Sequence, residues 1–135
     1  MNNSREEYDK RKIRYFLKDN CPFCTNLKEN SEKILFKNNF WIVIKNKYPY
    51  FNCSKWLLAF PKKHKELTSE LENEELISFV EVEKFMKNFY WENDYFSFIR
   101  QTKSNKSVEH MHYHYILGSP SAENISGENY FKVKY

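Results

Sequence analysis

Three of the chain's four histidines lie within five positions, in the sequence HMHYHYI from His110 to Ile116. Alternate side chains of a β-strand face the same side of a sheet, so a strand here would place His110, His112 and His114 on one face. At about 3.3 Å per residue the three imidazoles would form a row spaced by roughly 7 Å. Imidazole is both a common metal ligand and a common nucleophile or base, so the motif indicates a metal site or a catalytic strand. The alternative is a row of polar side chains on an exposed sheet face.

A second group of reactive side chains is the pair Cys21 and Cys24 in CPFC. The C-x-x-C spacing lets two thiolates bind one ion, and Zn²⁺ takes four ligands in tetrahedral geometry. A redox pair and a chance pair of buried thiols are the alternatives. His64 ends PKKH, just after an apolar stretch, from where it could turn back toward a sheet. With both cysteines and one more histidine it would complete a Cys₂His₂ zinc site.

These residues must be positioned by strands, which the sequence predicts in five places. Segments rich in β-branched and aromatic residues form strands, and a short polar turn such as KNN joins two of them in a hairpin. The third segment ends at a proline, which cannot donate to a ladder. The predicted strands are KILF (33–36), FWIVIK (40–45), KWLLAF (55–60), YFSFIRQ (95–101) and HMHYHYIL (110–117).

One long helix is predicted from Thr68 to about Tyr90. Ser69 followed three residues later by Glu72 has the spacing of a capping box at its start. Apolar residues then recur at helical spacing, at Phe79, Val82, Met86 and Phe89. Sequential strands with one inserted helix predict an α+β fold, an antiparallel five-stranded sheet covered by helix.

The composition bounds the class of protein. At 135 residues the chain has the usual length of one domain. Its net charge of +4 suits a small polyphosphate ligand but is only weak support for nucleic-acid binding. The 22 Lys and Arg residues and the many aromatic residues keep RNA binding as an alternative. The polar start has no apolar core of a signal peptide, and the longest apolar run, WLLAF, is too short to span a membrane. We therefore expect a cytoplasmic protein, no membrane partner, and cysteines that are thiols or metal ligands.

HMHYHYI resembles the signature of the histidine triad superfamily, His-φ-His-φ-His-φ-φ with φ apolar, at all three histidines. The resemblance continues in order through CPFC, IKNKYPY (44–50), WLLAFPKKH (56–64) and SVEHMHYHYI (107–116). With Tyr-Pro-Tyr after the second strand, the chain looks most like the zinc-containing bacterial branch of diadenosine tetraphosphate phosphorylases and hydrolases. The resemblance divides the chain into a polar or helical extension (1–20), a histidine triad domain (21–118) and a tail (119–135). We expect the tail to pack on the domain or on a dimer partner, with its NYFKVKY segment as a last strand or an arm.

The resemblance implies an enzyme that acts on a nucleotide or dinucleoside polyphosphate, such as a diadenosine polyphosphate. His112 maps to the nucleophile that attacks the α-phosphate and carries a nucleotidyl intermediate. His114 maps to the histidine that contacts the phosphate oxygens, and Ser107 to a hydroxyl near the phosphate and the leaving group. Asn46 falls where the family binds ribose hydroxyls. The resemblance also implies a homodimer in which two sheets join. In zinc-containing relatives the first triad histidine is a metal ligand, so the resemblance implies a structural zinc site of Cys21, Cys24, His64 and His110.

The chain departs from the family in two places. The loop TKSNKS (102–107) has no glycine where relatives bring backbone N–H groups close to phosphate. Asn105 in a left-handed conformation and the charge of Lys106 are the expected substitutes, and a solvated loop is the alternative. Trp56 stands where many relatives carry His before the third strand, so we expect it to be a core residue or to line an altered base pocket. The glycine-free loop also motivates a second hypothesis, a nucleotide-binding module without catalysis.

Overall fold

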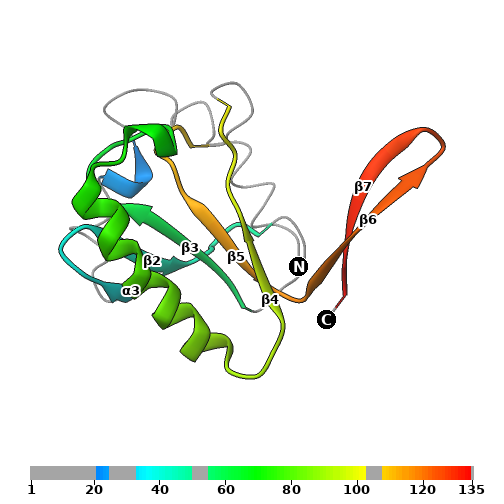
Figure 1. The fold of residues 1–135 in the computed structure, drawn as a ribbon, viewed down its shortest axis with the longest axis horizontal. Helices are drawn as coiled ribbons and strands as arrows, with labels where there is room; N and C mark the ends of the chain where they lie inside the picture. The colour runs from blue at the N-terminus through cyan, green and yellow to red at the C-terminus, as the bar shows by residue number, and fades with distance from the viewer. Residues whose placement is uncertain (1–20, 25–32, 50–54, 103–107, 135) are drawn as a thin grey trace.

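The computed structural model of the chain describes residues 21–24, 33–49, 55–102 and 108–134. Its main body is a five-stranded antiparallel sheet with the strand order β1-β2-β3-β5-β4, and one long helix runs across one face (Figure 1). The strands of this sheet are β1 (Ile34–Lys37), β2 (Trp41–Lys45), β3 (Trp56–Pro61), β4 (Tyr95–Phe98) and β5 (Tyr113–Leu117). The predicted α+β architecture, a five-stranded antiparallel sheet covered by helix, is confirmed.

The central strand β3 is buried along its whole length, and its alternation divides the core between the two faces of the sheet. Leu57 and Ala59 pack on the face that carries the helix, and Trp56, Leu58 and Phe60 pack on the other. Burial on both faces explains why this segment reads as an unbroken apolar run instead of an alternating one. Both faces of the sheet are packed, and the face opposite the helix carries His114.

The helix α3 spans Asn73–Tyr90 and follows a short 3-10 helix, η3 (Thr68–Glu70). The predicted capping box of Ser69 and Glu72 is wrong. Glu72 is itself the cap, and its backbone N–H donates to Glu75 Oε1 at 2.8 Å. Leu71 is extended, with φ −69° and ψ 140°, so the 3-10 turn that contains Ser69 cannot continue into α3. The helix therefore begins one turn later than predicted.

The predicted strand HMHYHYIL is shorter in the structure, because β5 begins at Tyr113 and not at His110. The ladder between β3 and β5 ends at the pair Ala59 and Tyr113. Continued pairing would bring Met111 opposite Pro61, which has no N–H to donate. The Met111 N–H instead donates to the Lys65 carbonyl at 2.6 Å. The first two triad histidines thus lie in a bend before the strand, and only the third lies in the sheet.

The C-terminal residues form a separate two-stranded hairpin of β6 (Ser119–Ile125) and β7 (Glu128–Lys134), which projects from the main body (Figure 1). For NYFKVKY, expected as a last strand or an arm, the structure has a strand, which pairs with residues 119–125. Ser126 and Gly127 both have positive φ, 52° and 85°, the conformation of a tight turn that lets β6 fold back on β7. No helix among the residues described here is long and apolar enough to cross a membrane.

Candidate active site and metal centre

The four predicted metal ligands lie together beyond the end of β3 and the start of β5. The ligand atoms of Cys21, Cys24, His64 and His110 all lie within 4.8 Å of one another. His110 Nδ1 is 3.5 Å from each cysteine Sγ, and His64 Nδ1 is 3.4 Å from Cys24 Sγ. Zinc bonds of about 2.3 Å to sulfur and about 2.05 Å to nitrogen at a tetrahedral angle place the two ligand atoms roughly 3.6 Å apart. The cluster therefore has the donor set and the spacing for a metal ion and is compatible with zinc.

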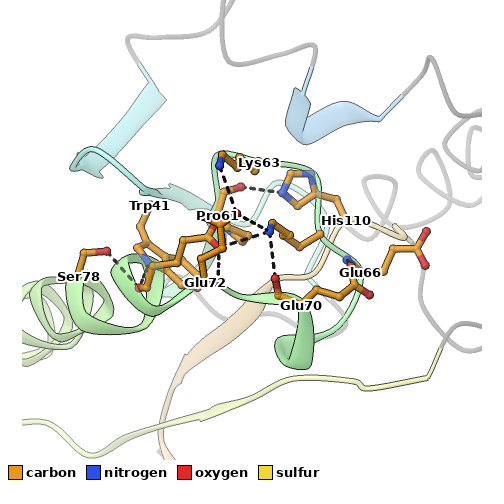
Figure 2. Close-up of polar contacts among 10 residues, drawn as sticks. Trp41, Pro61, Lys63, Glu66, Glu70, Glu72, Ser78 and His110 are labelled. Carbon is orange, nitrogen blue, oxygen red and sulfur yellow. Dashed lines mark hydrogen bonds and ion pairs between the residues drawn. The ribbon is translucent and has the colours of Figure 1, made fainter.

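His110 is oriented toward this cluster by a backbone carbonyl. Its ring is fully buried, and its Nε2–H donates to the Pro61 carbonyl at 2.7 Å (Figure 2). Because a carbonyl can only accept, the neutral ring carries its hydrogen on Nε2 and presents the Nδ1 lone pair to the two thiols. The proline that ends β3 thus also fixes the tautomer of a candidate metal ligand.

The thiol of Cys24 is harder to ionise than an ordinary thiol. Burial, and then the charge of and the hydrogen bond with Cys21, raises the pKa of Cys24 to about 11. A thiol binds a metal as the thiolate, so a dication between the two sulfur atoms would supply the charge that stabilises both. A divalent metal is the chemical partner that this donor set fits.

His112 has the opposite tautomer from His110. Its Nδ1–H donates to the carbonyl of His110 at 2.9 Å, so its Nε2 keeps the lone pair. The ring is half-buried and lies 4.9 Å, between ring centroids, from the ring of His114. A half-buried imidazole whose Nε2 carries the lone pair can act as a nucleophile or as a base.

His114 lies in β5 with 4% of its surface exposed. The ring of Phe98, its partner across the strand pair with β4, stacks on it at 4.5 Å with an interplanar angle of 5°. On the other neighbouring strand, Trp56 Nε1–H donates to His114 Nδ1 at 2.9 Å. Two neighbouring strands therefore fix both the plane and the rotation of this imidazole.

Phe23 connects the metal cluster with the half-buried histidine. Its ring stacks on Phe60 at 4.3 Å, with its centroid 5.6 Å from His110 and 5.2 Å from His112, both in edge-to-face geometry. It lies between the two cysteines in sequence, so its position is set by the same turn that places the thiols. Phe23 thus lines the site in addition to separating the two cysteines in sequence.

Lys65 fastens the loop after β3 to the start of α3. Its ammonium group donates to the Glu70 carbonyl at 3.0 Å and forms ion pairs of 3.6 Å with Glu72 and Glu75. Its carbonyl accepts from Met111 N–H, and its neighbour in sequence is His64. One lysine therefore holds both the loop that carries a metal ligand and the bend that carries His110 and His112.

The structure describes only some of the predicted substrate-binding residues. Asn46 follows β2, and its Oδ1 accepts from the Tyr48 N–H at 3.0 Å, so this oxygen stabilises its own turn. Ser107, Lys106 and Asn105 lie outside the described residues. Their roles stay predictions.

Solved structures provide the comparison at the level of fold. The chain is similar to the diadenosine triphosphate hydrolase of Plasmodium falciparum, with TM-score 0.58 and 21% identity over 67% of this chain and 63% of that one, so it spans less than two thirds of that hydrolase. A HIT family hydrolase from Clostridium thermocellum has TM-score 0.61 and 22% identity over 76% of this chain and 94% of that one. A histidine triad nucleotide-binding protein from Candida albicans has TM-score 0.61 and 17% identity over 85% of this chain and 82% of that one. The chain has the histidine triad fold. No protein-family model and no curated protein sequence matches it.

Within the histidine triad fold, sequence reasoning missed the residues that orient the three rings. The sequence predicts Phe98 only as part of a strand and assigns no role to Phe23. Strand parity could have found Phe98, since it shares the face of His114 on the neighbouring strand. Trp56 was expected to be core or pocket, and the structure shows a core residue with 1% exposure whose polar atom contacts the triad.

Proposed function

We propose that this protein is a nucleotide hydrolase or nucleotidyl transferase that cleaves a phosphoanhydride or phosphoramidate bond at the α-phosphate. His112 is the nucleophile and carries the nucleotidyl intermediate. The observation that carries the proposal is the hydrogen bond from His112 Nδ1–H to the His110 carbonyl, which leaves a lone pair on Nε2 next to a second imidazole. Backbone fixation of the non-reacting nitrogen is what a nucleophilic imidazole requires, because attack needs the neutral ring with its lone pair directed outward.

The reaction has two steps that balance at the phosphorus atom. The lone pair of His112 Nε2 forms an N–P bond, and the P–O or P–N bond to the leaving group breaks with its electron pair retained by that group. Water or another acceptor then forms an O–P bond and loses its proton to solvent, the N–P bond breaks, and the electron pair returns to Nε2. His114 holds the phosphate oxygens during both steps, where positioned donors stabilise developing negative charge.

Three further residues would complete the substrate site. Ser107 would donate its hydroxyl near the phosphate and the leaving group, and Lys106 and Asn105 would supply a charge and a turn where the loop lacks glycine. Asn46 would bind the ribose through its side-chain amide, because its Oδ1 is already bound within the turn after β2. These assignments follow from the resemblance and from the position of each residue in the sequence.

The substrate class that we propose is a dinucleoside polyphosphate, in particular a diadenosine polyphosphate, as in the zinc-containing bacterial branch of phosphorylases and hydrolases. One structural neighbour is a diadenosine triphosphate hydrolase and another a nucleotide-binding protein. A net charge of +4 is favourable for a polyphosphate ligand.

We propose that the metal is a structural Zn²⁺ held by both cysteines, His64 and His110. When bound it would fasten the CPFC turn to the end of β3, which keeps Phe23 against the nucleophile. Two soft thiolates and two imidazoles are the ligands that structural zinc prefers. No proton or phosphate in the proposed reaction passes through the metal.

The proposed assembly is a homodimer with joined sheets, in a reducing cytoplasm, with residues 21–118 as the catalytic domain between an N-terminal extension and a C-terminal tail. Strand β4 lies at the edge of the sheet, where a second copy can continue the ladder. Light scattering on the purified protein should give twice the chain mass, and a monomer at the concentration of the activity assay would contradict the dimer.

The test of the function is turnover of diadenosine tri- and tetraphosphate by the wild type and by His112→Ala. We expect the variant to lose turnover by at least about 10³-fold while thermal shifts still report nucleotide binding. The matched control is Tyr113→Phe, at the adjacent position of β5 on the helix-facing side of the sheet, which should keep turnover. Unchanged turnover in His112→Ala refutes the proposal. Nucleotide binding by a wild type that turns over neither compound supports instead the non-catalytic module that the glycine-free loop suggests.

A further inference from the structure

The contact between Trp56 and His114 follows from the register of two neighbouring strands. Trp56 on β3 is paired with Ile116 on β5, and Leu58 is paired with His114. The tryptophan is therefore the diagonal neighbour of the histidine on the same face of the sheet, a separation that large side chains can bridge. The indole closes this gap with its ring centroid 5.8 Å from the imidazole and its N–H 2.9 Å from Nδ1.

The direction of this hydrogen bond determines the tautomer of His114. Indole N–H can only donate, so Nδ1 of His114 must present a lone pair, and the hydrogen of the neutral ring lies on Nε2. Backbone carbonyls can only accept, so the ring nitrogens that contact them carry the hydrogen. These nitrogens are Nε2 of His110 and Nδ1 of His112. His112 is thereby given a lone pair on Nε2, whereas His114 is given an N–H at the same ring position.

We propose that Trp56 is a positioning residue that fixes His114 as its Nε2–H tautomer, so that this imidazole donates a hydrogen bond to the phosphate attacked by His112. The inference rests on the proposed function for the identity of the ligand, but not for the tautomer. The opposite tautomer would present a lone pair to the anionic phosphate and would repel it. The donor role thus depends on a residue on another strand that touches no substrate.

The stacking of Phe98 on the His114 ring adds to the constraint that the hydrogen bond from Trp56 imposes. Phe98 is stacked face to face on the imidazole, with the rings nearly parallel at 5°. Rotating the ring out of this plane would break the stack and the bond to Trp56 together, at a site where His114 is 4% exposed. Ring orientation and tautomer are therefore set by packing before any substrate binds.

The chain provides a matched control for substitution of this tryptophan. Trp56→Phe keeps an aromatic ring and removes the N–H. Trp91→Phe makes the same chemical change at a residue that follows the end of α3 and is 74% exposed. The third tryptophan, Trp41, donates to the Glu75 carbonyl on the helix side of the sheet and is left unchanged in both variants.

The experiment is nitrogen-15 NMR of the full-length, zinc-loaded protein, with and without AMP. The pattern of two-bond proton–nitrogen correlations distinguishes imidazole tautomers, and with four histidines in the chain each ring can be assigned from single substitutions. We expect the wild type to show His114 as Nε2–H, with a scalar coupling across the hydrogen bond between Trp56 Nε1 and His114 Nδ1. An Nδ1–H tautomer, or no such coupling, overturns the proposal even if Trp56→Phe fails to fold.

For a folded Trp56→Phe we expect a mixture of His114 tautomers and a kcat about 10–100-fold lower with a smaller change in KM, as for loss of a donor used in the transition state. Trp91→Phe should retain the wild-type spectrum and kcat. An unchanged tautomer in Trp56→Phe overturns the proposal. Because the spectrum is read without turnover, an inactive wild type with the expected tautomer refutes the catalytic function and leaves the role of Trp56 as a tautomer-setting residue supported.

Discussion

The ion pair of Lys65 and Glu75 is the interaction most open to a quantitative test, because it fastens the loop of the metal site to the helix. The carboxylate of Glu75 is 1% exposed and the side chain of Lys65 is 16% exposed, with 3.6 Å between Nζ and Oε1. We predict that Glu75→Gln destabilises the protein and also weakens the metal site, which Glu75 does not touch. The reason is that Lys65 follows His64 and accepts from the Met111 N–H through its carbonyl.

The expected loss of unfolding free energy in Glu75→Gln follows from the geometry of the ion pair. At 3.6 Å and an effective dielectric constant of about 20, two unit charges attract by roughly 4–5 kcal/mol before desolvation is counted. Lys65 retains its bonds to Glu70 and Glu72 in the variant, so its charge is not left isolated. We therefore expect Glu75→Gln to cost about 2–3 kcal/mol, below the usual cost of breaking an isolated buried pair.

Urea unfolding of the zinc-loaded wild type, Glu75→Gln, Lys65→Met and the double variant gives the coupling energy, which we expect to be about 1–3 kcal/mol. The control is Lys63→Met, because Lys63 and Glu72 are 3.5 Å apart but 62% and 55% exposed. That exposed pair should contribute less than about 1 kcal/mol. A chelator competition should show about tenfold weaker zinc binding in Glu75→Gln. A coupling energy below about 0.5 kcal/mol, or a control variant that costs as much, would refute the reasoning.

Three other predictions follow from the site and the core. Metal analysis should find about one zinc per chain. Changing both Cys21 and Cys24 to serine should remove the zinc and lower the stability of the protein. Metal-free protein of undiminished stability would contradict the zinc site. Phe23→Leu should keep the zinc but lower kcat about tenfold, since the ring against His112 is lost; a wild-type kcat would show that the contact is irrelevant to catalysis. Burial, and then the hydrogen bond to Glu83, raises the pKa of Tyr115 well above its usual range. The unfolded chain ionises this group at about pH 10, so folded stability should fall above that pH, and urea unfolding of Tyr115→Phe should show a smaller fall.

Much of the sheet was predictable because its information is local. Each strand predicted from β-branched and aromatic residues is present, with bounds that differ by one to three residues. The errors occur where a tertiary contact determines the end of a strand or helix. Strand β5 starts late because Pro61 on the neighbouring strand cannot donate, and the Met111 N–H goes to Lys65 instead. The cap of α3 moved to Glu72 because Lys65, from another loop, pairs with it and with Glu75.

The members of the candidate metal cluster were predictable, but two of the histidine tautomers were not. Spacing and residue type indicated Cys21, Cys24 and His64 as candidate ligands, the resemblance added His110, and the structure brings the four side chains together. The tautomers of His110 and His114 were beyond the sequence, since they depend on groups far along the chain. The Pro61 carbonyl is 49 residues from His110, and the indole of Trp56 is 58 residues from His114.

The central claim, covalent catalysis by His112, is tested most directly by trapping the intermediate. The wild type is mixed with diadenosine triphosphate and quenched on the time scale of one turnover, at alkaline pH where a phosphoramidate survives. Intact mass and peptide mapping then locate any adenylyl group. We predict one adenylyl group on His112 that forms and decays at rates consistent with turnover. Turnover without an adduct, or with an adduct on another residue, would contradict it.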